Sequence, residues 1–141
     1  MGFLIPWLGS RQAHRRAFIQ ERIGPIERFT NTTGEYFELL EGHAQGDGVL
    51  GVGHSETAKA LASEMSHALL PDFLPSHSAL EAIDDAKLTE TFTAVEKMGG
   101  VVRMLVDLGG AAMPAHILSS TLVDGEKTIR RARRRIKALL V

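Results

Sequence analysis

The chain has 141 residues and contains no cysteine. This absence excludes disulfide bridges, thiolate chemistry and zinc sites that use cysteine ligands. Strand signals are nearly absent too, because no segment alternates apolar and polar residues over a useful length. Aromatic residues make up only 6% of the chain, and nothing in it resembles an aromatic platform for stacking nucleic-acid bases.

Long apolar runs are also missing. The uncharged stretch over residues 108–123 has 16 residues, whereas a membrane span needs about 20, so a buried helix is favoured there. At the start of the chain the apolar run precedes the arginines, which is the reverse of a secretory signal peptide. We therefore expect a protein that is not secreted by a signal peptide and that lies inside a cell or within a virion or similar assembly.

Helical periodicity is present along most of the chain. Apolar residues recur at spacings of three and four, and Gly24-Pro25 and the prolines at 71 and 75 are predicted to interrupt them. The expected helices cover residues 10–23, 26–42, 56–70, 78–106 and 114–140. The sequence thus predicts a single all-α domain over residues 1–141, with about five helices in an antiparallel bundle or an extended helical hairpin arrangement and no sheet.

The most regular pattern begins at Val101, where spacings of three and four alternate strictly. Such heptads predict that a helix packs against other helices along a narrow seam. The members are Val101, Met104, Leu108, Ala111, Ala115, Leu118, Leu122, Gly125, Ile129, Ala132, Ile136 and Leu139.

The seam and the apolar opening of the chain together suggest self-association. Residues 1–10 are interpreted as an apolar N-terminal arm that docks on a neighbouring copy or on its own core. The predicted contacts of a homo-oligomer are Phe3, Leu4, Ile5, Trp7 and Leu8 in the arm, and Leu118, Leu122, Ile129 and Ile136 in the seam.

Charge is strongly segregated, although the net charge is only −1. Residues 1–28 carry +3, residues 29–110 carry −9 and residues 111–141 carry +5. Two basic ends therefore flank an acidic middle. This asymmetry suits docking of one copy's end on another's middle, or contact between the ends and an anionic partner.

The glycine-rich stretch GDGVLGVGHSET, residues 46–57, invites two catalytic interpretations. A phosphate-binding P-loop fails because His54 takes the place of the essential lysine and no strand precedes it. A hydrolase nucleophile turn around Ser55 fails because Thr57 replaces its second glycine and the strand is again missing. We expect a Gly-rich loop over residues 43–54, followed by a helix that Ser55 caps.

A metal site is the next alternative. Glu64 and His67 form a Glu-x-x-His pair on a predicted helix, which is the spacing used in carboxylate-bridged di-iron bundles. The full arrangement needs a second such pair, which this chain lacks, although a homodimer would supply one from each copy. We therefore expect no metal and no other cofactor, and keep a di-iron-type bundle enzyme as a remote alternative.

The C-terminal stretch EKTIRRARRRIKALLV is the strongest chemical signal. Arginine favours planar, bidentate recognition of phosphate and carboxylate, and so many cations on one helix need counter-charges. Candidates are phosphates, lipid headgroups and the acidic middle of a neighbouring copy. The residues predicted to bind nucleic acid or an acidic partner are Arg130, Arg131, Arg133, Arg134, Arg135 and Lys137.

These patterns predict a structural or assembly subunit without enzymatic activity, similar in role to a coat, connector or scaffold protein. It would self-associate and contact a nucleic-acid backbone through its C-terminal helix. The alternative is a small nucleic-acid-binding protein without sequence specificity. A membrane surface is disfavoured, and no small-molecule substrate is indicated.

Overall fold

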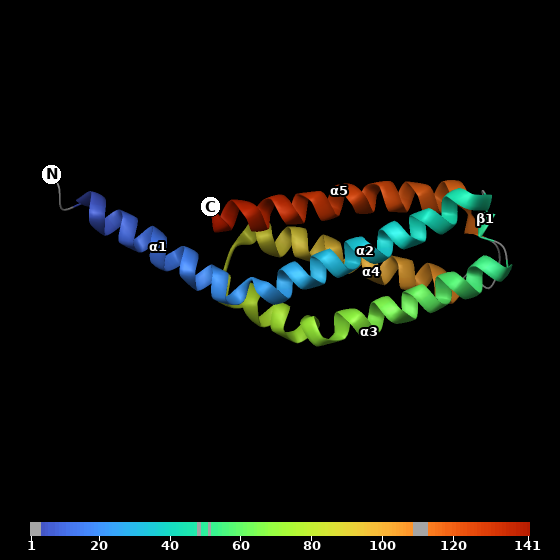
Figure 1. The fold of residues 1–141 in the computed structure, drawn as a ribbon, viewed down its shortest axis with the longest axis horizontal. Helices are drawn as coiled ribbons and strands as arrows, with labels where there is room; N and C mark the ends of the chain where they lie inside the picture. The colour runs from blue at the N-terminus through green and yellow to red at the C-terminus, as the bar shows by residue number, and fades with distance from the viewer. Residues whose placement is uncertain (1–3, 48, 51, 109–112) are drawn as a thin grey trace.

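The computed structural model describes the backbone of residues 4–47, 49–50, 52–108 and 113–141 and the side chains of residues 11–40, 60–100 and 124–141. Most of this backbone is helical (Figure 1). The elements are α1 (Leu4–Arg22), α2 (Gly24–Asp47), β1 (Val49–Leu50), α3 (Val52–Ile83), α4 (Ala86–Leu108), β2 (Met113–Pro114) and α5 (Ala115–Leu140).

Helices α2 to α5 run alternately up and down and lie side by side (Figure 1). Each packs on the next, and α5 returns to α2, so the four enclose one core. The predicted all-α class with five helices is confirmed. The one departure from it is small: β1 and β2 form an antiparallel pair with two residues each, which ties the two connections at one end of the bundle together.

The core is aliphatic, with two aromatic rings at its centre. Phe29 of α2 and Phe92 of α4 are almost fully buried, with their ring centroids 4.9 Å apart. The other buried members of this cluster are Ile19, Ile23, Ile26, Ala79, Leu80, Ile83, Leu88, Val95, Ile129, Ala132 and Ile136. Helices α1 to α5 all contribute, α1 through Ile19 near its end.

Helix α3 corrects the sequence prediction, because Pro71 and Pro75 lie inside it and do not end it. A proline inside a helix removes one backbone hydrogen bond and costs about 3 kcal/mol. Both prolines are exposed, so water can reach the carbonyls that lose their donors. On the opposite side, Ser76, Ala79 and the residues after them remain buried against the core. This packing holds the helix together.

The break that was expected between residues 70 and 78 occurs instead at Asp84 and Asp85. Asp84 has a positive φ of 52°, the left-handed conformation that ends helices. The Oδ1 atom of Asp85 accepts a hydrogen bond from the backbone N–H of Leu88 at 2.8 Å and so caps α4. One predicted helix over 78–106 is therefore the end of α3 and most of α4.

The remaining boundaries agree better. The predicted break at Gly24-Pro25 falls between α1 and α2, and the predicted helix over 114–140 matches α5. The Gly-rich loop expected over 43–54 is corrected, because residues 43–47 belong to α2, Val49–Leu50 to β1 and residues 52–54 to α3. Among the described helices, none combines the length and apolarity needed to span a membrane.

Candidate anion-binding face of helix α5

Because an α-helix turns by 100° per residue, the sequence of α5 places its apolar residues on one side and its charged residues on the other. Over residues 124–140, whose side chains are described, the buried side is formed by Gly125, Ile129, Ala132 and Ile136, at spacings of four, three and four. The predicted heptad is thus confirmed over these positions. This part of the seam, however, lies on a helix that packs on α2 and α4 of the same chain.

This corrects two predicted oligomer contacts. Ile129 and Ile136 are 4% and 6% exposed inside the bundle, so neither is available to a second copy. The side chains of Leu118 and Leu122 are outside the described part of the structure. Both the backbone and the side chain of Phe3 are outside it. The other predicted arm contacts, Leu4, Ile5, Trp7 and Leu8, belong to the backbone of α1, and their side chains also lie outside the described part.

Arg135 is the first of two arginines that flank the buried side of α5. Its Nε and Nη2 atoms donate to Oδ1 and Oδ2 of Asp85 at 3.0 and 2.5 Å. These hydrogen bonds lower the pKa of Asp85 below its ordinary value, against the effect of burial, and raise the pKa of Arg135. Arg135 therefore fixes α5 to the start of α4 and is not free to bind a ligand.

Arg133 flanks the other side, toward α2. Its Nε atom donates to Oδ1 of Asn31 at 3.0 Å. A Cβ atom at Gly34 would lie 3.1 Å from Nη2 of Arg133, so the glycine leaves room for the guanidinium. Because Asn31 is neutral, this contact positions Arg133 without neutralising its charge.

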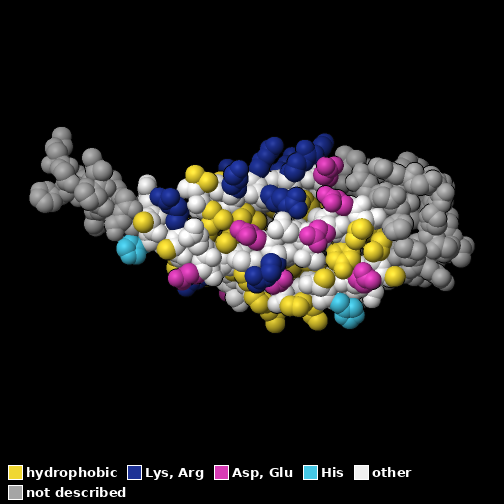
Figure 2. All heavy atoms as spheres, viewed as in Figure 1, with side chains coloured by type: hydrophobic (Ala, Val, Ile, Leu, Met, Phe, Trp, Pro, Cys, Tyr) yellow, Lys and Arg dark blue, Asp and Glu magenta, His cyan; other side chains and the backbone are white. Residues whose placement is uncertain are grey.

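Five further cations point away from the bundle and form what we call the outer face of α5. All are exposed, and no ion pair joins them to a carboxylate among the residues that the structure describes. They span ten helical steps, or about 15 Å. Figure 2 shows lysine and arginine side chains gathered along this edge of the molecule. The members are Lys127, Arg130, Arg131, Arg134 and Lys137.

Two carboxylates stand at the border of this face. Glu38 and Glu126 line a depression of about 300 Å³ between α2 and α5, together with Arg130 and Arg133. Neither carboxylate comes within ion-pair distance of an arginine there. The positive charge of the outer face is therefore only partly offset by its surroundings.

The described residues do not form a ligand set for the di-iron alternative. Glu64 and His67 are both exposed on α3. Within the described ranges no three histidine, aspartate or glutamate side chains come together as a metal site.

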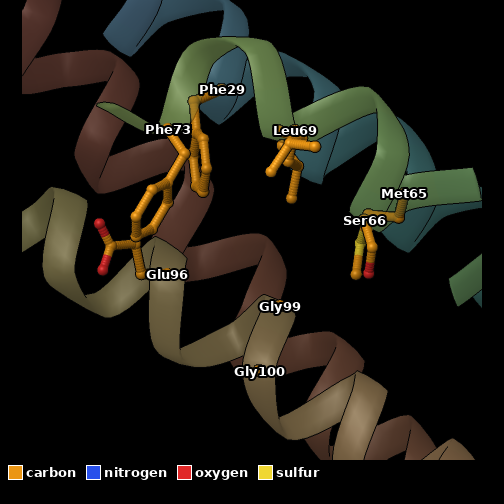
Figure 3. Close-up of a pocket in the computed structure, with 9 residues that line it drawn as sticks. Phe29, Met65, Ser66, Leu69, Phe73, Glu96, Gly99 and Gly100 are labelled. Atoms are coloured by element: carbon orange, nitrogen blue, oxygen red, sulfur yellow. The ribbon is translucent and has the colours of Figure 1, made fainter. Parts of the chain in front are cut away.

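Sequence reasoning missed a second surface, on α3. Leu70, Phe73 and Leu74 are exposed by 70%, 42% and 72%, and we call them the exposed apolar turn. Next to them is a pocket of about 210 Å³ between α3 and α4, which we call the α3–α4 groove (Figure 3). The signal was the segment LLPDFLP, which contains more apolar residues than one helix face can bury.

Comparison with protein-family models, with curated proteins and with solved structures finds no significant match to this chain. The two surfaces are therefore interpreted from their chemistry alone.

Proposed function

We propose that this protein binds the phosphate backbone of nucleic acid through the outer face of α5. The observation that supports this proposal is the presence of five exposed cations without carboxylate partners along about 15 Å of one helix. Neutralising phosphates and releasing their counterions supplies most of the affinity of non-specific binding. Three of the five cations are arginines, which contact phosphate oxygens in pairs.

The helix dipole alone does not account for the pattern. It favours cations only within the last turn of a helix. Lys127, Arg130 and Arg131 lie two turns or more before the end of α5 at Leu140. Mutual repulsion among them lowers stability unless a polyanion is bound, which favours a binding role over a purely structural one.

Sequence-independent binding fits the surroundings of this face. Residues 124–141 contain no aromatic side chain on which a base could stack. With contacts limited to phosphates, affinity depends on salt and hardly on sequence.

The test compares wild type with the triple variant Arg130→Gln, Arg131→Gln and Arg134→Gln, by fluorescence anisotropy on a labelled DNA duplex. Each lost phosphate contact reduces the slope of log K against log salt by about 0.9. We expect the slope to fall by about 2 to 3 and the affinity at low salt to fall at least about tenfold.

The matched control is Lys87→Gln with Lys97→Gln, which removes two exposed cations from α4. This variant should bind like wild type. Equal affinity of the triple variant and wild type would overturn the proposal. Binding to anionic vesicles but not to the duplex would replace it with a membrane-surface role.

A second candidate function, the assembly subunit predicted from the sequence, now depends on different residues. Since Ile129, Ala132 and Ile136 of the seam are buried within the chain, self-association would use the exposed apolar turn of α3 and the part of α1 beyond the bundle. An increase in mass with concentration, measured by light scattering, would support it.

A further inference from the structure

We infer that the α3–α4 groove is the docking site for helix α1 of a second copy of this chain. The inference rests on the assembly role proposed above and specifies its interface. It begins from the exposed apolar turn, where Leu70, Phe73 and Leu74 occupy little more than one helical turn. Isolated exposed leucines are ordinary, but a contiguous apolar patch beside a pocket marks an interaction site.

The groove has the shape to receive apolar side chains. One wall is Met65, Leu69 and Phe73 of α3, and Phe29 lies behind them (Figure 3). On the α4 side, Gly99 and Gly100 present bare backbone. A Cβ atom at Gly100 would meet nothing within 4 Å, so an incoming side chain can approach the α4 backbone closely.

Hydrogen-bond acceptors lie among the residues that line the groove and directly after two of them in sequence. Pro71 and Pro75 have no N–H, so the carbonyls of His67 and Pro71 lack the donor that a helix normally supplies four residues later. One buried carboxylate oxygen of Glu96 lies against Nε2 of His77 without hydrogen-bond geometry. A partner that carries several donors and positive charge would complement this rim.

Helix α1 has both required properties. It contains Leu4, Trp7 and Leu8 at helical spacing, followed by Arg11 and Arg16. Residues 1–22 hold four arginines and one glutamate, whereas residues 60–100, which supply most of the groove's lining, hold seven carboxylates and two lysines; of these carboxylates, Glu96 lines the groove. An apolar segment followed by cations thus complements an apolar groove that is lined by one carboxylate and lies on a net acidic part of the chain.

The geometry of α1 directs it to a second copy. Ile19 and Ile23 anchor its end in the core, and Nη2 of Arg15 donates to the carbonyl of Ile83 at the end of α3. From there α1 continues as one helix away from the bundle (Figure 1). Residues 11–17 are all exposed. The groove lies farther along α3, so α1 cannot reach it in its own chain without bending.

Trp7 gives a direct readout, since it is the single tryptophan in the chain. The experiment follows Trp7 emission and mass by light scattering as protein concentration rises, for wild type and for Leu70→Glu with Leu74→Glu. We expect wild type to gain mass while Trp7 emission shifts to shorter wavelength. In the double variant the dissociation constant should rise at least about tenfold and the emission should stay unshifted.

The control is Leu39→Glu, which changes a leucine on α2 that is 50% exposed and lies outside the groove. It should associate like wild type, and circular dichroism should show that each variant is folded. If the double variant associates and shifts like wild type, the groove is not the site, although assembly stands. If wild type stays monomeric at every concentration, the assembly role fails and the inference with it.

Discussion

Helices α3 and α5 are members of one bundle, yet they use their apolar residues differently. Over residues 124–141 of α5, the buried positions form one stripe and the charged ones cover the rest. Helix α3 buries Met65, Leu80 and Ile83 but exposes Leu70 and Leu74. A strictly amphipathic helix is accounted for by packing within its own chain. Exposed apolar residues that the core does not bury, as on α3, point to contacts with another molecule.

The largest expected effect tests whether apolar residues of α5 and α3 contribute differently to the free energy of unfolding. Ile129→Ala removes a buried side chain of α5 and should lower the free energy of unfolding by about 2 to 4 kcal/mol. Leu74→Ala removes a side chain of α3 that is 72% exposed and should change it by less than about 0.5 kcal/mol at low protein concentration. Urea denaturation of both variants measures the difference. Equal losses of unfolding free energy in the two variants would contradict the difference drawn between α5 and α3.

The next effect concerns the contact that joins α5 to the α3–α4 turn. Asp85→Ala removes both the bidentate partner of Arg135 and the cap of α4. We expect a loss of about 2 kcal/mol in the free energy of unfolding, combining a helix cap with a partly buried charged hydrogen bond. Arg135→Gln keeps the cap and should lose less. If Arg135→Gln lost as much as Asp85→Ala, the cap would contribute nothing.

The same contact predicts a dependence on pH. The hydrogen bonds from Arg135 hold the pKa of Asp85 below its ordinary value of 3.8, so the unfolded state binds the proton more tightly. This stabilisation is complete above about pH 5 and is lost as the pH falls below about 4. Thermal melts between pH 6 and pH 3 should show a smaller decrease for Asp85→Asn than for wild type. An equal decrease would assign acid sensitivity to other carboxylates.

The smallest effect compares two helical glycines. A Cβ atom at Gly125 of α5 would lie 2.7 Å from both Met98 and the ring of Phe37, so Gly125→Ala should lose about 1 kcal/mol despite better helix propensity. Gly100 of α4 has open space, and Gly100→Ala should gain up to about 1 kcal/mol. Opposite signs in paired thermal melts are the expected result. A gain at both positions would mean that α5 packs less closely on α2 than described.

Much of the fold could be predicted from the sequence because hydrophobic periodicity reports helix type and inward face directly. The break at Gly24-Pro25 and the extent of α5 were predicted well for this reason. The prolines of α3 led to a wrong prediction of a helix end. Local helix propensity counts the cost of a proline but not the tertiary packing that offsets this cost. The cation cluster of the candidate site was also predictable. The different roles of Arg135 and Arg134 could not be predicted. Arg135 is paired with Asp85, which lies 50 residues away in sequence.

The sequence by itself determined the all-α class, the segregation of charge and the identity of the cationic helix. These follow from composition and from spacings of three and four, which are local properties of a chain. Only the tertiary structure decided that the described part of the α5 seam packs within one molecule and that α3 continues through two prolines. It also decided that Leu70, Phe73 and Leu74 stay exposed outside the core. Those outcomes depend on which faces the four helices of the bundle bury against one another, and that choice involves residues far apart in sequence.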